Sequence, residues 1–190
     1  MDIINLLKKH QSAILDKWYD LILSTYPEET VRFLLREKDP FANPVGSNSR
    51  KSIQDVYEAL INDMNPESIK PLLDPVVRIR AVQEFTPAKA LGFILGLKSV
   101  IRLILKNEIK KDTSIEPQLQ RLDSRIDQLC LVAFDIYMGC REQIYQFKAD
   151  HVKDRTLRLL KKANLLCEVP EVGTEIIPHN VYKNGGFGDT

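Results

Sequence analysis

The sequence is poor in the residues that build specialised folds and sites. Its 190 residues include eight glycines, three cysteines, three histidines and one tryptophan. An odd number of cysteines without paired spacing is not typical of a disulfide-stapled secreted domain, so we expect reduced thiols and a cytoplasmic protein. The 27 Lys and Arg residues nearly cancel the 26 Asp and Glu residues, which argues against a general nucleic-acid binder. With 44% hydrophobic residues, the composition is that of a soluble globular protein.

The chain also has no long hydrophobic run. The most apolar stretch, residues 90–97, is eight residues long and is followed by Lys98. A helix that crosses a bilayer needs about 20 apolar residues. Near the N-terminus, residues 8–10 (Lys-Lys-His) interrupt what would have to be the apolar core of a signal peptide. We therefore predict a protein that is neither exported nor integral to a membrane.

Apolar residues recur at helical spacing along most of the sequence, and no convincing alternating strand pattern appears before the last 26 residues. This pattern predicts an all-α multi-helix bundle. Asn65-Pro66 and Asp74-Pro75 each place a capping residue before a first-turn proline, so we expect two short helices to begin there. The other expected helices cover residues 3–25, 28–38, 49–64, 86–107 and 117–164. Within the helix at 86–107, Gly92 and Gly96 are expected to let another helix pack closely.

The last expected helix is unusually long, because no proline occurs between Pro117 and Pro170. At 1.5 Å per residue, residues 117–164 would extend roughly 70 Å, whereas a domain of this size is about 30–40 Å across. We therefore expect this helix to project, to kink or to pair with a second chain. A seam with spacings of three and four residues is the candidate interface of a homodimer. It consists of Leu119, Leu122, Ile126, Leu129, Ala133, Ile136 and Cys140.

Charge is segregated toward the C-terminus, and this predicts three regions. Residues 1–145 form a helical sensor or input domain with little net charge. Residues 146–164 form a basic extension of the last helix, and residues 165–190 form an extended, acidic, glycine-containing tail with a net charge of −3. The basic extension is most simply a solvated helix face, with an acidic protein partner as the second interpretation; nucleic acid is the least favoured. Its candidate partner-binding residues are Lys153, Arg155, Arg158, Lys161 and Lys162.

No pattern for catalysis or metal binding stands out. His10, His151 and His179 are far apart in the sequence, and none lies within the apolar body where a haem ligand would have to be. Cys130 and Cys140 lie on the apolar seam, where cysteine usually acts as a small hydrophobic residue. We therefore predict a protein that is not an enzyme and that has no cofactor or metal site.

Asp135 is the unusual residue, because it lies within the apolar segment LCLVAFDIYMGC. A carboxylate buried there would need a cationic partner. Arg78 and Arg80, in VVRIRAVQEF, are the candidate partners for such a buried polar pair. A structural ion pair or a half-exposed position is the simpler interpretation, and a ligand or switch site is the alternative.

Residues 26–46, YPEETVRFLLREKDPFANPVG, contain a distinctive loop. Its two prolines fix the backbone, Gly46 is expected to permit a reversal, and Phe41 and Val45 are expected to fold back onto the helices. A structural corner is the simplest interpretation. The candidate signature residues of the loop are Asp39, Pro40, Phe41, Asn43, Pro44 and Gly46.

With this loop, the sequence resembles the N-terminal domain family of RsbT co-antagonist proteins, the RsbRD-type input domain. TPAKALGFILGLKSVIR at 86–102 and FDIYMGCREQIY at 134–145 add to the resemblance. The resemblance implies an all-α sensor or input domain related to the stressosome, with a dimeric, globin-like fold that lacks haem. In such relatives the last helix leads to a STAS domain. The residues after Asn164 in this sequence do not contain one, so the input-domain role is the one we expect.

These observations favour a non-enzymatic sensor, regulatory or adaptor domain that acts through dimerisation and protein–protein contacts. The alternative is an accessory or structural subunit of a larger complex, docking through residues 165–190. A pull-down that compares the intact chain with one lacking those residues distinguishes the two.

Overall fold

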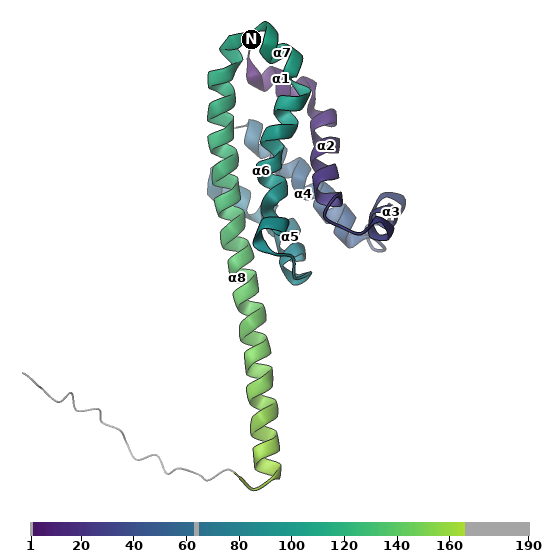
Figure 1. The fold of residues 1–190 in the computed structure, drawn as a ribbon, viewed down its shortest axis with the longest axis vertical. Helices are drawn as coiled ribbons and strands as arrows, with labels where there is room; N and C mark the ends of the chain where they lie inside the picture. The colour runs from purple at the N-terminus through teal and green to yellow at the C-terminus, as the bar shows by residue number, and fades with distance from the viewer. Residues whose placement is uncertain (1, 63–64, 166–190) are drawn as a thin grey trace, which may run out of the picture. The chain divides into compact units, whose positions relative to one another are not determined.

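The computed structural model describes residues 2–62 and 65–165, and within them the chain is helical with no strand. The predicted all-α bundle with a long C-terminal helix is therefore confirmed (Figure 1). The helices are α1 (Ile3–Lys9), α2 (Gln11–Leu23), α3 (Glu28–Arg36), α4 (Pro44–Ile61), α5 (Pro66–Val82), α6 (Pro87–Ile104), α7 (Lys106–Lys111), a 3₁₀ turn (Thr113–Ile115) and α8 (Glu116–Lys162).

The chain divides into two compact units, residues 1–148 and 149–190. The first unit contains α1 to α7 and the larger part of α8. The described part of the second unit, residues 149–165, comprises the remainder of α8 and three residues beyond it, and all of these residues are exposed except the half-buried Leu160. The predicted acidic tail lies outside the described residues, apart from Leu165 itself.

Side-chain caps begin helices α4 and α6. Asn43 accepts a hydrogen bond from the Gly46 amide (2.8 Å) and Thr86 accepts one from the Lys89 amide (3.4 Å). In each case a proline follows the capping residue, where its missing N–H costs no helical hydrogen bond. The Asn43 cap starts α4 five residues earlier than the apolar pattern predicts.

The two short helices expected at Pro66 and Pro75 are in fact one helix, α5, with Pro71 and Pro75 inside it. An interior proline costs about 3 kcal/mol because it removes a hydrogen bond and crowds the preceding turn. Burial of one apolar face outweighs this cost, since proline lies outside that face at both positions. The buried residues of α5 include Ile69, Leu73, Val76, Val77 and Ala81.

Two other predicted helices are each divided in the structure. The segment at 3–25 forms α1 and α2, which meet at His10, and the segment at 86–107 forms α6 and α7, which meet at Leu105. Neither break is marked by proline or glycine. The periodic pattern therefore predicted the helical state of both segments correctly but did not predict the break within each of them.

The core of the first unit lies where α2 packs against α4 and α6, and where α4 packs against α5. Two polar side chains within it are fully paired. The Trp18 indole donates to the Phe93 carbonyl (2.8 Å), and the Tyr57 hydroxyl donates to the Leu7 carbonyl (3.0 Å). Buried hydrogen bonds of this kind hold helices in one register, because an unpaired polar group in the core is costly.

The two glycines of α6 have different surroundings. A Cβ at Gly96 would lie 2.6 Å from the Leu21 Cδ1 of α2, so the expected close helix approach occurs there. A Cβ at Gly92 would meet no atom within 4 Å. Gly92 is therefore on an open face of α6, and among the described residues no segment makes the close approach predicted for it.

The predicted dimer seam of α8 is buried inside its own chain. Its seven residues have 0 to 6% of their surface exposed and belong to the same core cluster as α2 and α6. This burial corrects the prediction that the seam pairs with a second chain. The reason is that α6 runs alongside α8 (Figure 1), where Lys98 contacts Asp127 (2.6 Å) and Arg102 contacts Asp123 (2.7 Å).

Candidate functional site

The loop between α3 and α4 is organised around the buried side chain of Asn43. Its Nδ2 donates to the carbonyls of Leu34 (3.0 Å) and Glu37 (2.9 Å), while its Oδ1 accepts from the Gly46 amide. Asn43 is 3% exposed. One side chain thus joins the end of α3 to the start of α4.

Two details of this loop differ from the sequence-based expectation. Phe41 is 96% exposed and does not fold back, whereas Val45 is half-buried against the core. Gly46 lies within helix α4 and the chain does not reverse there. A residue with a side chain does not fit at this position, because its Cβ would lie 2.5 to 2.9 Å from atoms of the Asn43 side chain. Asp39 accepts a hydrogen bond from the Phe41 amide, and Pro40 and Pro44 are exposed around it.

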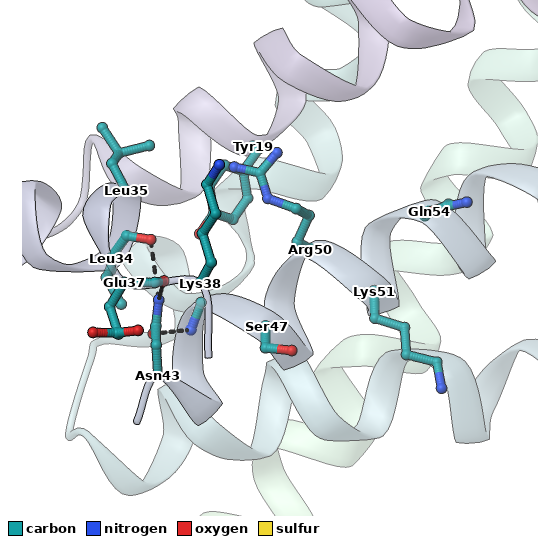
Figure 2. A pocket seen from close by; sticks show the side chains of 11 residues that line it. Tyr19, Leu34, Leu35, Glu37, Lys38, Asn43, Ser47, Arg50, Lys51 and Gln54 are labelled. Carbon is teal, nitrogen blue, oxygen red and sulfur yellow. Dashed lines mark hydrogen bonds between the residues drawn. The ribbon is translucent and has the colours of Figure 1, made fainter. Parts of the chain in front are cut away.

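The Asn43 loop forms one wall of a cavity of about 510 Å³ (Figure 2). The other walls come from the end of α3, the first turns of α4 and one residue of α2. Its lining is mostly polar and basic, with Leu34 and Leu35 as the apolar part. The polar and basic lining residues include Tyr19, Lys38, Ser47, Arg50, Lys51 and Gln54.

Positive charge exceeds negative charge in this cavity. The Arg50 guanidinium lies 4.1 Å from the centre of the Tyr19 ring. Burial raises the pKa of the Tyr19 hydroxyl, and the nearby Arg50 partly offsets this rise. Glu37 is the one acidic lining residue, and its carboxylate accepts a hydrogen bond from the Asp39 amide (3.0 Å). Sequence reasoning missed the cavity because its residues are brought together by three helices.

The buried ion pair predicted around Asp135 does not form. Asp135 is exposed on α8, and Arg78 forms an exposed pair with Asp74 one turn earlier on α5 (2.8 Å). Arg80 is the buried member of the three, with 1% of its surface exposed. The prediction failed at Asp135 because α8 carries apolar residues on two faces, and the aspartate lies beside the outer one.

Arg80 is buried without a carboxylate partner in the described part of the chain. Its Nε donates to the Ala90 carbonyl (2.8 Å), and its Nη2 donates to the Lys89 carbonyl (2.7 Å) and the Thr25 hydroxyl (3.0 Å). The rings of Phe85, Phe93 and Tyr26 lie 4.8 to 5.7 Å from the guanidinium. Burial lowers the pKa of Arg80, but an arginine remains charged in proteins.

Arg80 is close in sequence to the connection between α5 and α6, residues 83–86, which we call the α5–α6 corner. Helix α8 contacts this corner. Between α5 and α6, Glu84 adopts a positive φ of 60°. On α8, the Tyr137 hydroxyl donates to the Phe85 carbonyl, Arg141 donates to the Ala81 carbonyl (3.2 Å) and Lys148 pairs with Glu84 (2.9 Å). The α5–α6 corner is thus attached to α8 over three turns of that helix.

The outward side of α8 carries large apolar residues. Leu131, Phe134, Met138 and Tyr145 are 43 to 68% exposed. At 3.6 residues per turn they fall within about 60° of one another around the helix axis. We call this set the outer face of α8. It differs from the buried seam, which lies on the side of the helix that packs into the bundle.

The predicted partner-binding residues of the basic extension are all exposed. Lys153, Arg155, Arg158, Lys161 and Lys162 belong to the second unit. Because these side chains are exposed, both interpretations of the basic extension, a solvated helix face and a binding site for an acidic partner, stay open. The described residues contain no cluster of metal-ligating side chains, and no helix among them has the length and apolarity needed to span a membrane.

Comparison with known families identifies the chain. A sequence model of the RsbT co-antagonist protein rsbRD N-terminal domain matches residues 12–151. The chain belongs to this family. The rsbRD N-terminal domain match covers α2 to α7 and the larger part of α8, including the Asn43 loop, the Arg80 surroundings and the outer face. No match is found among curated proteins or among solved structures.

Proposed function

We propose that the chain is a non-enzymatic regulatory input domain that forms a homodimer through the outer face of α8 and the exposed side of α6. The match to the rsbRD N-terminal domain supports a stressosome-related regulatory role. The observation that carries the dimer is the outer face itself. Contiguous exposed apolar surface of this kind is typical of interaction sites.

The exposed side of α6 carries further apolar residues. Leu95 and Leu103 are 45% and 62% exposed, and Gly92, on the same side of the helix, has open space before it. A residue without a side chain at that position allows another helix to come close. Burial of apolar surface contributes about 25 cal/mol per Å², so the two helices together offer a favourable interface.

The charges near this surface favour a second copy of the chain over a charged partner. Lys98 and Arg102 of α6 are already paired with Asp127 and Asp123 of α8. The cations of α6 nearest to α8 are therefore already satisfied within the chain. Two identical apolar faces related by a two-fold axis can bury each other.

A signal would reach the dimer through α8. This helix holds the α5–α6 corner through Tyr137 and Arg141, and its outer face forms the proposed interface. A ligand or partner that moves the helical body would therefore shift the two α8 helices relative to each other. Cys130 and Cys140 are free thiols, which supports the proposed cytoplasmic location.

The molar mass of the full chain in solution tests the dimer. We expect light scattering to give about twice the 21.8 kDa of one chain. The double variant Leu131→Lys, Met138→Lys places two charges on the outer face and is expected to give the mass of one chain with unchanged helical circular dichroism. Phe41→Lys, at an exposed aromatic residue of the α3–α4 loop, is the matched control and should remain dimeric.

Two results would contradict this proposal. A monomeric mass for the unmodified chain would exclude the dimer, and a dimeric mass for the double variant would place the interface elsewhere. The alternative role, an accessory subunit that docks through residues 165–190, depends on residues outside those described.

A further inference from the structure

The cavity beside the Asn43 loop has the properties of a small-molecule binding site. Its volume of about 510 Å³ lies within the range of roughly 300–1,000 Å³ that is typical of such sites. One side is apolar, at Leu34 and Leu35, and the rest carries hydroxyl, amide and cationic groups. This mixture suits an organic molecule with a charged group at one end.

The charge of that end follows from the lining residues. Three cations, Lys38, Arg50 and Lys51, and one carboxylate, Glu37, are among the lining residues. Glu37 already accepts a backbone hydrogen bond. Within the described residues, Arg50 has a single long ion contact, 4.0 Å to Asp16 outside the cavity lining, and the two lysines form no ion pair. Positive charge in the cavity is therefore not neutralised by the protein.

The orientation of the cations supports the same conclusion. In Figure 2 the side chains of Lys38 and Arg50 both extend toward Tyr19, whereas the Lys51 side chain extends away from them. The Tyr19 ring holds the Arg50 guanidinium in place from one side. A guanidinium fork and an ammonium group that line the same cavity match the oxygens of a phosphate or a carboxylate.

We propose that this cavity binds a small organic oxyanion, a phosphate or a carboxylate, through Lys38 and Arg50, with the body of the ligand against Leu34 and Leu35. Ser47 supplies an uncharged hydrogen-bonding group in the lining. We infer that this ligand is the signal that the input domain senses, and this role for the ligand rests on the proposed function. Binding itself is independent of that role.

Isothermal titration calorimetry on the full chain tests the site with three probes: inorganic phosphate, glycerol 3-phosphate and citrate. We expect saturable binding of an organic probe, with phosphate and carboxylate distinguished by which probe binds more tightly. Arg50→Gln and Lys38→Gln should each weaken binding about tenfold or more, because each removes a charge-assisted hydrogen bond. Lys110→Gln, at an exposed lysine of α7 outside the cavity lining, is the matched control and should change it less than about twofold.

Two outcomes would overturn the proposal: no saturable binding of any probe at millimolar concentration, or equal weakening by all three variants, which indicates general charge attraction. All three side chains are exposed, so unchanged circular dichroism is expected and checks the fold of each variant. The dimer is measured separately by molar mass. Failure of this site is therefore distinct from failure of the proposed function.

Discussion

Asn43 and Gly46 act as one unit at the start of α4. The amide of Asn43 makes three hydrogen bonds to backbone groups, and Gly46 leaves the space that this amide occupies. The Asn43 side chain can therefore cap α4 only because the residue three positions later has no side chain. The Asn43 loop also forms a wall of the proposed oxyanion cavity, so its geometry affects ligand binding as well as stability.

Gly46→Ala is expected to lower the free energy of unfolding by about 2 kcal/mol, because the new methyl group displaces the Asn43 cap. Gly139→Ala in α8 is the matched control. A Cβ at Gly139 meets no atom within 4 Å, so the substitution should add up to about 1 kcal/mol through helix propensity. Urea denaturation monitored by circular dichroism measures both. Equal effects of the two substitutions would contradict the steric explanation.

At the scale of helices, α5 shows how packing outweighs local preference. Pro71 and Pro75 are four residues apart and both exposed, while the opposite side of the helix is buried in the core. The prolines remove backbone hydrogen bonds without contributing buried surface. The helix is thus held together by its tertiary contacts and not by its own backbone alone.

Pro75→Ala is expected to raise the free energy of unfolding by about 1–2 kcal/mol. Restoring the backbone hydrogen bond and relieving the crowded turn contribute up to about 3 kcal/mol, and the greater freedom of the unfolded chain offsets about 1 kcal/mol of this gain. The measurement is thermal and urea unfolding of the full chain. A loss of stability would show that Pro75 makes a packing contribution that its exposure does not indicate.

The helices of this protein follow from the sequence more reliably than their packing does. Apolar periodicity and capping residues identify the helical segments, and the loop motif identifies the family. The outward position of Asp135 does not follow, because α8 has an apolar stripe on each of two sides and the pattern cannot tell which of them packs inside. The same ambiguity led to the buried residues of α8 being predicted as the dimer seam.

At the scale of the whole chain, the first unit is the part that carries the fold. Every fully buried residue in the described part of the chain lies at or before Cys140. The described residues of the second unit add none. The division after Lys148 lies three residues beyond the domain boundary predicted from the sequence at residue 145.

A chain that ends at Lys148 is expected to keep the free energy of unfolding of the full chain within about 0.5 kcal/mol, since the removed residues bury no side chain in the described structure. Urea denaturation of both chains at equal concentration provides the measurement. A loss of about 2 kcal/mol or more would show that residues 149–190 contribute to the fold.

The burial of Arg80 among neutral groups has a consequence for the behaviour of the protein in acid. The guanidinium is held by two carbonyl oxygens, a hydroxyl group and aromatic rings. None of these groups takes up a proton as the solution is acidified. Surface arginines such as Arg102 lose their partners when the carboxylates become neutral. Arg80 does not, so the polar contacts at the junction of α2, α5 and α6 do not depend on the carboxylates that acid neutralises elsewhere in the molecule.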